Sequence, residues 1–390
     1  MSSRKNLLKF PQAIFLIFIF SIFLELIFWY VPLDNIGSIK TIEQDPNFSD
    51  SNYYLYWATE FCQNPEIGVD ELNKTWSSSG IIGYLTYGCR LFNTEFFYII
   101  LNPFIFVMGI FIYKYSLKNY IDINKIGFKY LILLPYTCLI IASPGKEVIS
   151  IFGYMEVITG LSLLTINKKK LGAYLLIFCG LLILYMNRPH EMGMVMIFSI
   201  LWLLGFFKNW YRIIIIGITL IYGADYLLSN FDFGLNIKSL NDENLWSGDS
   251  SGKLYNIDFL SQILHSNNII VHALLGPLRI ILVIFSPLIS LISWGYETDF
   301  NYYLYRDLSQ KLRIFDLIFI IYVFSQIYKY RISGIDCKLT KVKSLLPWFF
   351  IYMIYIVTFF GITQKSRYIF EFTPVLLLWL WISQLENSSE

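Results

Sequence analysis

Several charged residues of this chain lie in short polar segments where two long apolar runs meet. Lys146 and Glu147 lie in one such segment, "ASPGKEVIS" (142–150), and Arg188, His190 and Glu191 lie in another, "NRPHE" (187–191). An arginine guanidinium binds phosphate through two parallel hydrogen bonds, whereas a lysine ammonium binds it as a point charge. A nearby carboxylate or neutral histidine can accept a proton. Together these residue types suit a pyrophosphate-linked lipid substrate and an acid–base step.

A third segment of this kind, "GITQKSRYIFEFTP" (361–374), contains Lys365 and Arg367. Taken singly, each cation is better explained as an interfacial residue, because long Lys and Arg side chains reach the lipid headgroups. Ionisable groups at membrane depth are costly, however, and by default they indicate a function. Three cationic clusters on one face therefore favour a substrate site, in which Lys146, Arg188, Lys365 and Arg367 are the candidate binding residues.

Asp50 precedes a group of aromatic residues in "DPNFSDSNYYLYWATEF" (45–61). Tyr and Trp concentrate at membrane interfaces, and their rings also stack on sugar faces. Asp50 stands out because it lies well beyond the first apolar run. The candidate catalytic residues are Asp50, Glu147 and His190. The candidate aromatic contacts to substrate are Tyr53, Tyr54 and Trp57.

The elements that must position these residues are predicted to be membrane-spanning helices. Hydrophobic residues make up 56% of the 390 residues and charged residues 15%, whereas soluble domains contain about a quarter charged residues. Apolar runs of about 18 to 20 residues are long enough to cross a bilayer as helices. We therefore expect an all-α polytopic membrane protein with a single membrane domain over residues 1–390. The predicted spans are 10–31, 96–113, 130–142, 148–166, 171–186, 192–207, 213–228, 314–328, 345–361 and 369–383.

The distribution of basic residues predicts which ends of the spans lie in the cytoplasm. The segments rich in Lys and Arg are 1–9, 114–129, 167–170, 208–212 and 329–343. Together they hold 17 of the 30 Lys and Arg residues and only two acidic residues. The segment 34–95 has nine acidic against three basic residues, and 225–268 has six against two. These two segments are predicted to be large outer loops, with both chain termini in the cytoplasm.

A further apolar segment, 269–293, is interrupted by Pro277 and Pro287. If it crossed the membrane fully, the basic segment 329–343 would lie outside, against the charge rule. We therefore expect a re-entrant or interfacial segment, which leaves about ten crossings. A model with eleven crossings and one exception to the rule is the alternative.

The sequence lacks the motifs of several common classes of enzyme. The predicted cytoplasmic segments are too short to hold a nucleotide-binding domain, and neither GxGxxG nor a P-loop occurs. No Cys or His spacing is typical of a metal site, so no metal is expected. We also expect no cofactor and no nucleic-acid partner. Cys62 and Cys89 share the first predicted outer loop, and they could form a disulfide if that loop faces an oxidising compartment.

The order of the polar segments resembles that of the Wzy-type O-antigen and capsule repeat-unit polymerases and the related EpsG-like membrane proteins. The resemblance consists of an acidic residue before Tyr-Tyr in the first outer loop, the Lys146–Glu147 turn, the Arg-Pro turn at Arg188, and "SRY" followed by Pro near the last helix. It covers most of the chain as an architecture. The Arg-x15-Gly pattern of some members is not matched, because Gly205 is one position too far from Arg188.

This resemblance implies an enzyme of the bacterial cytoplasmic (inner) membrane. It would transfer a growing glycan from undecaprenyl pyrophosphate to a new lipid-linked repeat unit on the outer face of that membrane. The lipid-linked oligosaccharide and the membrane are the implied partners, with chain-length regulator and flippase proteins as further candidates.

Two alternatives remain at this point. A GT-C glycosyltransferase with a lipid-monophosphate sugar donor would use Asp50 as its base. A flippase or transporter of lipid-linked glycans would require polar residues spread along a path through the helices.

Overall fold

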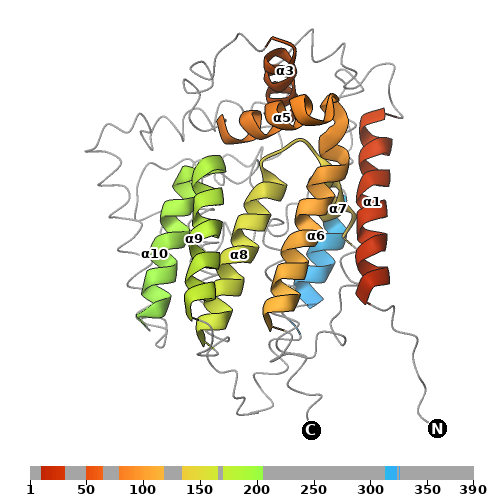
Figure 1. Cartoon of the computed structure of the whole chain (residues 1–390). Coiled ribbons are helices and arrows are strands. Elements are labelled where there is room, and N and C mark those ends of the chain that lie inside the picture. Colours follow the sequence, from red (N-terminus) through yellow and green to blue (C-terminus); the bar gives the residue numbers. More distant parts are fainter. Residues whose placement is uncertain are drawn as a thin grey trace, which may run out of the picture. The chain divides into compact units, whose positions relative to one another are not determined.

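The regular structure in the described part of the chain is entirely helical. A computed structural model describes residues 10–30, 50–64, 79–117, 134–165, 170–204, 312–322 and 325. In chain order its labelled helices are α1 (Phe10–Tyr30), α3 (Asp50–Gln63), α5 (Ser79–Phe92), the 3-10 helix η1 (Glu95–Phe97), α6 (Tyr98–Leu117), α7 (Pro135–Ala142), α8 (Glu147–Thr165), α9 (Lys170–Asn187) and α10 (Pro189–Leu203) (Figure 1). A further helix covers residues 312–322.

The chain divides into two units, and the structure discussed below lies in the first. This unit comprises Met1–Met196, Tyr296–Ile335 and Thr373–Glu390, and α10 continues from it into the second unit.

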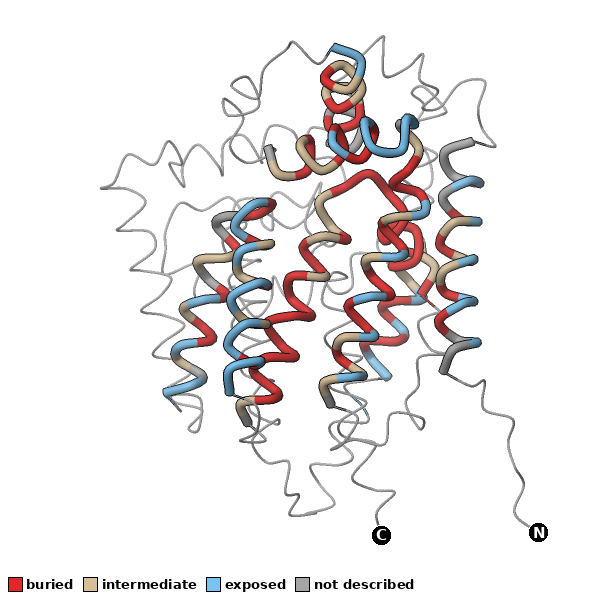
Figure 2. The backbone as a smooth tube through the Cα atoms, viewed as in Figure 1, coloured by how far each residue is buried: buried red, intermediate tan, exposed pale blue. Residues whose placement is uncertain are grey.

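Three of the described helices are long and apolar enough to cross a membrane, namely Tyr98–Ser116 in α6, Glu147–Leu164 in α8 and Lys170–Asn187 in α9. They differ in their surroundings. In α8, 78% of the segment Glu147–Leu164 is buried inside the protein, whereas in α9 only 22% of the segment Lys170–Asn187 is buried (Figure 2). A helix that is apolar on all sides and largely buried is a core helix. The α8 helix therefore forms the centre of this unit, and α9 presents apolar side chains on its surface.

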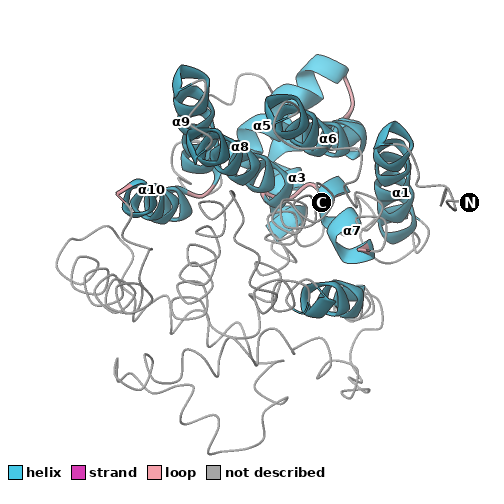
Figure 3. Cartoon of the chain, turned by 90° about the horizontal axis from the view of Figure 1, so that it is seen from below, coloured by secondary structure: helices cyan, strands magenta, loops and turns pink. Residues whose placement is uncertain are grey.

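The close packing of α8 against α9 depends on small residues where the two helices meet. Viewed along the helix axes, α9, α8 and α6 lie in a row with α1 beside α6 (Figure 3). A Cβ atom added to Gly180 of α9 would lie 2.5 Å from the carbonyl oxygen of Gly153 in α8. Small residues at such positions let two helix backbones approach closely without a hydrophobic driving force. This contact lets α8 and α9 pack closely along their lengths.

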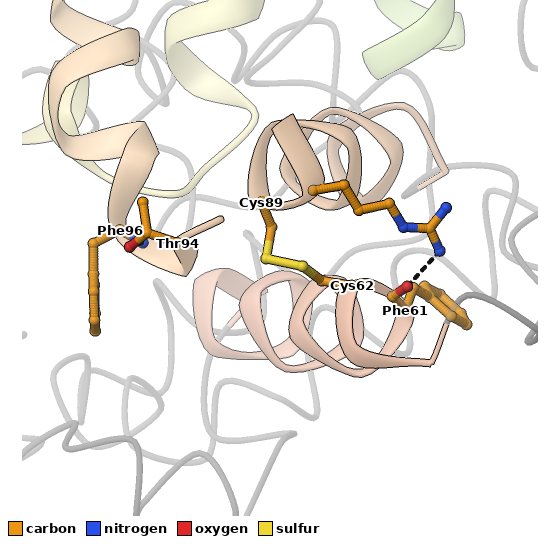
Figure 4. The surroundings of a disulfide bond; sticks show 6 residues. Phe61, Cys62, Cys89, Thr94 and Phe96 are labelled. Atoms are coloured by element: carbon orange, nitrogen blue, oxygen red, sulfur yellow. Dashed lines mark hydrogen bonds between the residues drawn. A yellow bond between two sulfur atoms is a disulfide. The ribbon is translucent and has the colours of Figure 1, made fainter. Parts of the chain in front are cut away.

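The helices α3 and α5 pack against each other across one end of the membrane helices (Figure 1). Their shared core includes Leu55 and Phe61 of α3 with Ile81 and Leu85 of α5. A disulfide joins Cys62 to Cys89, with the two Cα atoms 6.0 Å apart (Figure 4). The disulfide that the sequence left conditional is therefore present. We refer to α3 and α5 together as the outer pair.

Several predicted spans correspond to described helices, whereas the span 130–142 is helical in the described residues only from Pro135 onward, after the non-helical Leu134. The spans 96–113, 148–166 and 171–186 correspond to α6, α8 and α9, each within a few residues. The predicted spans 213–228, 345–361 and 369–383 lie outside the described residues, as do the predicted outer loop 225–268 and the predicted re-entrant segment 269–293. The predicted outer loop 34–95 contains α3 and α5, and η1 begins at its last residue; the hydropathy pattern indicated none of these helices.

Candidate functional site

The turn between α7 and α8 places Lys146 and Glu147 at a helix N-terminus. Ser143 ends α7, because its backbone N–H and its hydroxyl both donate to the carbonyl oxygen of Ile140, at 3.2 and 2.9 Å. The carbonyl of Lys146 accepts the first hydrogen bond of α8, from the N–H of Ser150 at 3.0 Å. Glu147 is thus the first residue of α8, where the helix dipole favours a negative charge.

Gly145 allows the Glu147 carboxylate to fold back over this turn. A Cβ atom added at Gly145 would overlap Oε2 of Glu147 and lie 3.0 Å from its carboxyl carbon. Any larger residue here would displace the carboxylate, and the turn is itself buried at Ser143, Pro144 and Gly145. The sequence "SPGKE" therefore determines where the carboxylate lies.

Arg188 lies at the junction of α9 and α10. Its N–H donates to the carbonyl of Leu184 at 2.6 Å, and its own carbonyl accepts from the N–H of Met192 at 3.0 Å. Arg188 therefore closes one helix and opens the next. Pro189 follows as the first residue of α10, a position where proline costs no hydrogen bond and its fixed φ suits the helix.

The Arg188 guanidinium connects two carboxylates from different helices. Its Nη1 lies 2.7 Å from Oε1 of Glu191, and its Nη2 lies 3.4 Å from Oε1 of Glu147. The Arg188 and Glu191 side chains are only 5% and 2% exposed, whereas that of Glu147 is 14% exposed. Tyr154 of α8 donates its hydroxyl to the other oxygen of Glu191. Glu191 is therefore held on both sides, and Glu147 is the more weakly paired and more accessible carboxylate.

The outer pair contacts this cluster through an aromatic ring. Lys146 Nζ lies 5.1 Å from the centre of the Tyr54 ring on α3, within the range of a cation–π interaction. Trp57 stacks on Phe61 with ring centres 5.7 Å apart, so it belongs to the packing of α3. Tyr54 is also a buried member of the shared core, and Trp57 is partly buried against that core, so of these two predicted substrate contacts only Tyr54 is shown at the cluster.

A hydrogen-bonded chain leads from the outer pair to the turn before α8. The Tyr84 hydroxyl of α5 donates to Oδ1 of Asn102 in α6 at 2.6 Å, and Nδ2 of Asn102 donates to the carbonyl of Ser143, also at 2.6 Å. Asn102 is fully buried. Burial raises the pKa of the Tyr84 phenol well above its ordinary value, so the hydroxyl stays protonated and able to donate.

The structure brings Lys146, Glu147 and Arg188 together with Tyr54 in the first unit. Asp50 is the first residue of α3 and His190 lies in the first turn of α10, but the side chains of Asp50, Tyr53 and His190 lie outside the described part. Lys365 and Arg367 also lie outside the described residues. Their roles stay predictions.

Three polar residues at the site were not identified from the sequence. Tyr154 lies seven positions after Glu147, on the same face of α8 two turns further on, and this spacing could have indicated it. Asn102 contacts the turn from a helix distant in sequence and Tyr84 contacts Asn102, and no local pattern indicates such contacts. Among the described residues, no group of His, Cys, Asp and Glu could hold a metal ion.

Comparison of the sequence with protein-family models finds no matching family, and comparisons with curated proteins and with solved structures find no match either.

Proposed function

We propose that this chain is a glycosyltransferase of the bacterial cytoplasmic membrane. It polymerises undecaprenyl-pyrophosphate-linked repeat units into surface polysaccharide on the outer face. The observation that carries the proposal is the cluster of Lys146, Glu147, Arg188 and Glu191, which combines cations and carboxylates at neighbouring helix ends. The order of polar segments that resembles the Wzy-type polymerases supports the choice of reaction.

The proposed reaction requires both kinds of group. The acceptor hydroxyl attacks the anomeric carbon of the growing glycan, the bond to the pyrophosphate oxygen breaks, and lipid pyrophosphate leaves. Cations stabilise the negative charge that builds on the leaving group. Lys146 and Arg188 fit this role, with Lys365 and Arg367 as further candidates. A base accepts the proton of the acceptor hydroxyl.

Glu147 is the base candidate that the geometry favours, and its contact with Arg188 suggests how substrate binding prepares it. An incoming pyrophosphate competes with carboxylates for the guanidinium. It would displace Glu147, whose contact is 3.4 Å, before Glu191, whose contact is 2.7 Å and whose second oxygen is held by Tyr154. A carboxylate released from a guanidinium accepts a proton more readily. Asp50 and His190 are the other candidate bases.

The disulfide of the outer pair supports the proposed side of the membrane. Disulfides persist in oxidising compartments such as the bacterial periplasm and are rare in the cytosol. Cys62 and Cys89 both belong to the segment 34–95, which the charge distribution independently predicts to be an outer loop. Lys146 contacts the outer pair through Tyr54, which is consistent with a site on the outer face.

The test compares Arg188→Ala and Glu147→Gln in a strain from which the gene has been deleted. The surface polysaccharide is displayed by length on a gel, and the amount of protein in the membrane is measured alongside. Lys170→Ala is the matched control, because it removes an exposed cation from the opposite end of α9. We expect single repeat units on the lipid carrier for both site variants and wild-type chains for the control.

Other outcomes point to other functions. If the deletion strain still makes long chains but each repeat lacks one sugar, the protein is a GT-C transferase. If completed repeat units accumulate on the cytoplasmic face, it is a flippase. If both site variants give normal chains at normal protein levels, the assignment of the cluster is wrong.

A further inference from the structure

We propose that Asn102 and Tyr84 are positioning residues that hold the turn carrying Lys146 and Glu147. Asn102 acts through its hydrogen bond to the turn and Tyr84 through its hydrogen bond to Asn102, and neither contacts substrate in this role. The effect expected on catalysis rests on the function proposed above, whereas the effect on the turn does not.

Asn102 is suited to this role because its amide offers a donor and an acceptor at fixed positions. The Ser143 carbonyl can only accept, so it orients the amide with Nδ2 on its side and leaves Oδ1 to accept from the Tyr84 hydroxyl. A leucine would make neither bond. An aspartate of the same size would keep the acceptor for Tyr84, but its carboxylate would face the Ser143 carbonyl without a donor.

The turn needs such support because its backbone is buried. A buried carbonyl without a partner costs more than an ordinary hydrogen bond contributes. The carbonyl of Ser143 accepts its hydrogen bond from α6 rather than from α7 or α8. The position of the turn is therefore linked to α6, and through Tyr84 to α5.

The outer pair meets the same turn a second time through Tyr54 and Lys146. Tyr54 belongs to α3 and Tyr84 to α5, and the Cys62–Cys89 disulfide joins these two helices. The turn thus contacts one pair of helices both directly and through Asn102. We infer that the outer pair sets the position of Lys146 and Glu147 relative to Arg188.

The experiment measures the reactivity of Lys146 toward an amine-directed acylating reagent in the full chain in detergent. Labelling is quantified by mass spectrometry and normalised to the exposed Lys170. We expect Tyr84→Phe and Asn102→Asp to raise Lys146 labelling about fivefold, the factor that corresponds to one ordinary hydrogen bond. Tyr87→Phe is the matched control, because Tyr87 is exposed on the same helix, and it should leave labelling unchanged.

The design separates positioning from folding and from function. Tyr84→Phe removes a single oxygen atom, so it keeps the test decisive if Asn102→Asp fails to accumulate. Unchanged Lys146 labelling in a folded Tyr84→Phe protein would overturn the proposal. Raised labelling with normal polysaccharide length would confirm the tether and overturn its link to the reaction. If the protein is not a polymerase, labelling still changes while chain length is unaffected even by Arg188→Ala.

Discussion

Removing the Cys62–Cys89 disulfide should loosen the outer pair without unfolding the membrane helices. The two cysteines are 27 positions apart in sequence. The chain-entropy relation for a closed loop of this length gives a stabilisation of roughly 3.5 kcal/mol, which corresponds to a change of several-hundred-fold in an opening equilibrium. The variant Cys62→Ser/Cys89→Ser should therefore open α3 from α5 far more often than the wild type does.

The remaining contacts of the outer pair should keep its average structure. In the variant only Cys89 of the shared core and Cys62 packed against it are changed, and Arg90 still donates to the carbonyl of Phe61 (Figure 4). Amide hydrogen exchange of the full chain in detergent reports such local opening. We expect faster exchange in peptides from 50–63 and 79–92, and wild-type exchange in 147–165, which serves as the internal reference.

Two results would refute this reasoning. In denatured wild-type protein, reduction should expose two additional thiols to a maleimide reagent, and finding no additional thiol would show that the disulfide does not form. Exchange in the double variant equal to that of the wild type would show that loop closure contributes nothing. Cys179→Ser is the matched control, because Cys179 is a free, exposed cysteine on α9.

Two further substitutions test the packing and the charges of the site. In Gly80→Ala a Cβ atom would overlap the carbonyl oxygen of Met186 in α9 and lie 2.7 Å from its carbonyl carbon, so we expect a loss of about 1–3 kcal/mol in thermal unfolding in detergent. Gly83→Ala on the same helix has open space and should be neutral or stabilising, and equal behaviour of the two variants would contradict the predicted overlap. Glu191→Gln removes the nearer charge partner of the buried Arg188, so we expect a loss of about 3–5 kcal/mol, seen as a lower thermal transition and less protein in the membrane. A Glu191→Gln protein as stable as the wild type would show that Arg188 does not depend on this ion pair.

The membrane helices were predictable because their length and composition follow from the bilayer. Apolar runs of membrane length ended at polar residues, and α6, α8 and α9 begin and end close to the predicted limits. The outer pair was not predictable in the same way. The helices α3 and α5 are 14 residues long and too short to span a membrane, and α3 is rich in polar residues. Their pairing depends on a shared core and a disulfide between distant positions.

The proximity of the Lys146 and Arg188 segments could be predicted from the sequence, but their pairing could not. The segments at Lys146 and at Arg188 were both expected at helix ends on one face, and the structure places them together. Hydropathy gives no information on how helices are rotated about their axes. For this reason the sequence could not indicate that Arg188 would bind Glu147 as well as Glu191, or that Asn102 would reach Ser143.

The burial of the cluster has a consequence for the proposed reaction. Arg188 is 5% exposed and Glu147 is 14% exposed, so a lipid-linked glycan reaches them only if a neighbouring element moves. The contact between Tyr54 and Lys146 is one link between α3 and the cluster. A cation–π pair contributes about 0.5–2 kcal/mol, whereas a buried ion pair is harder to break. Separating this pair therefore costs less than breaking the ion pairs of Arg188. The disulfide ties α3 to α5, and α5 contacts the end of α9 at Gly80. Without the disulfide, α3 is joined to α5 by their shared core, so we expect its cleavage to alter the contact of Tyr54 with Lys146 before it alters the ion pairs beneath.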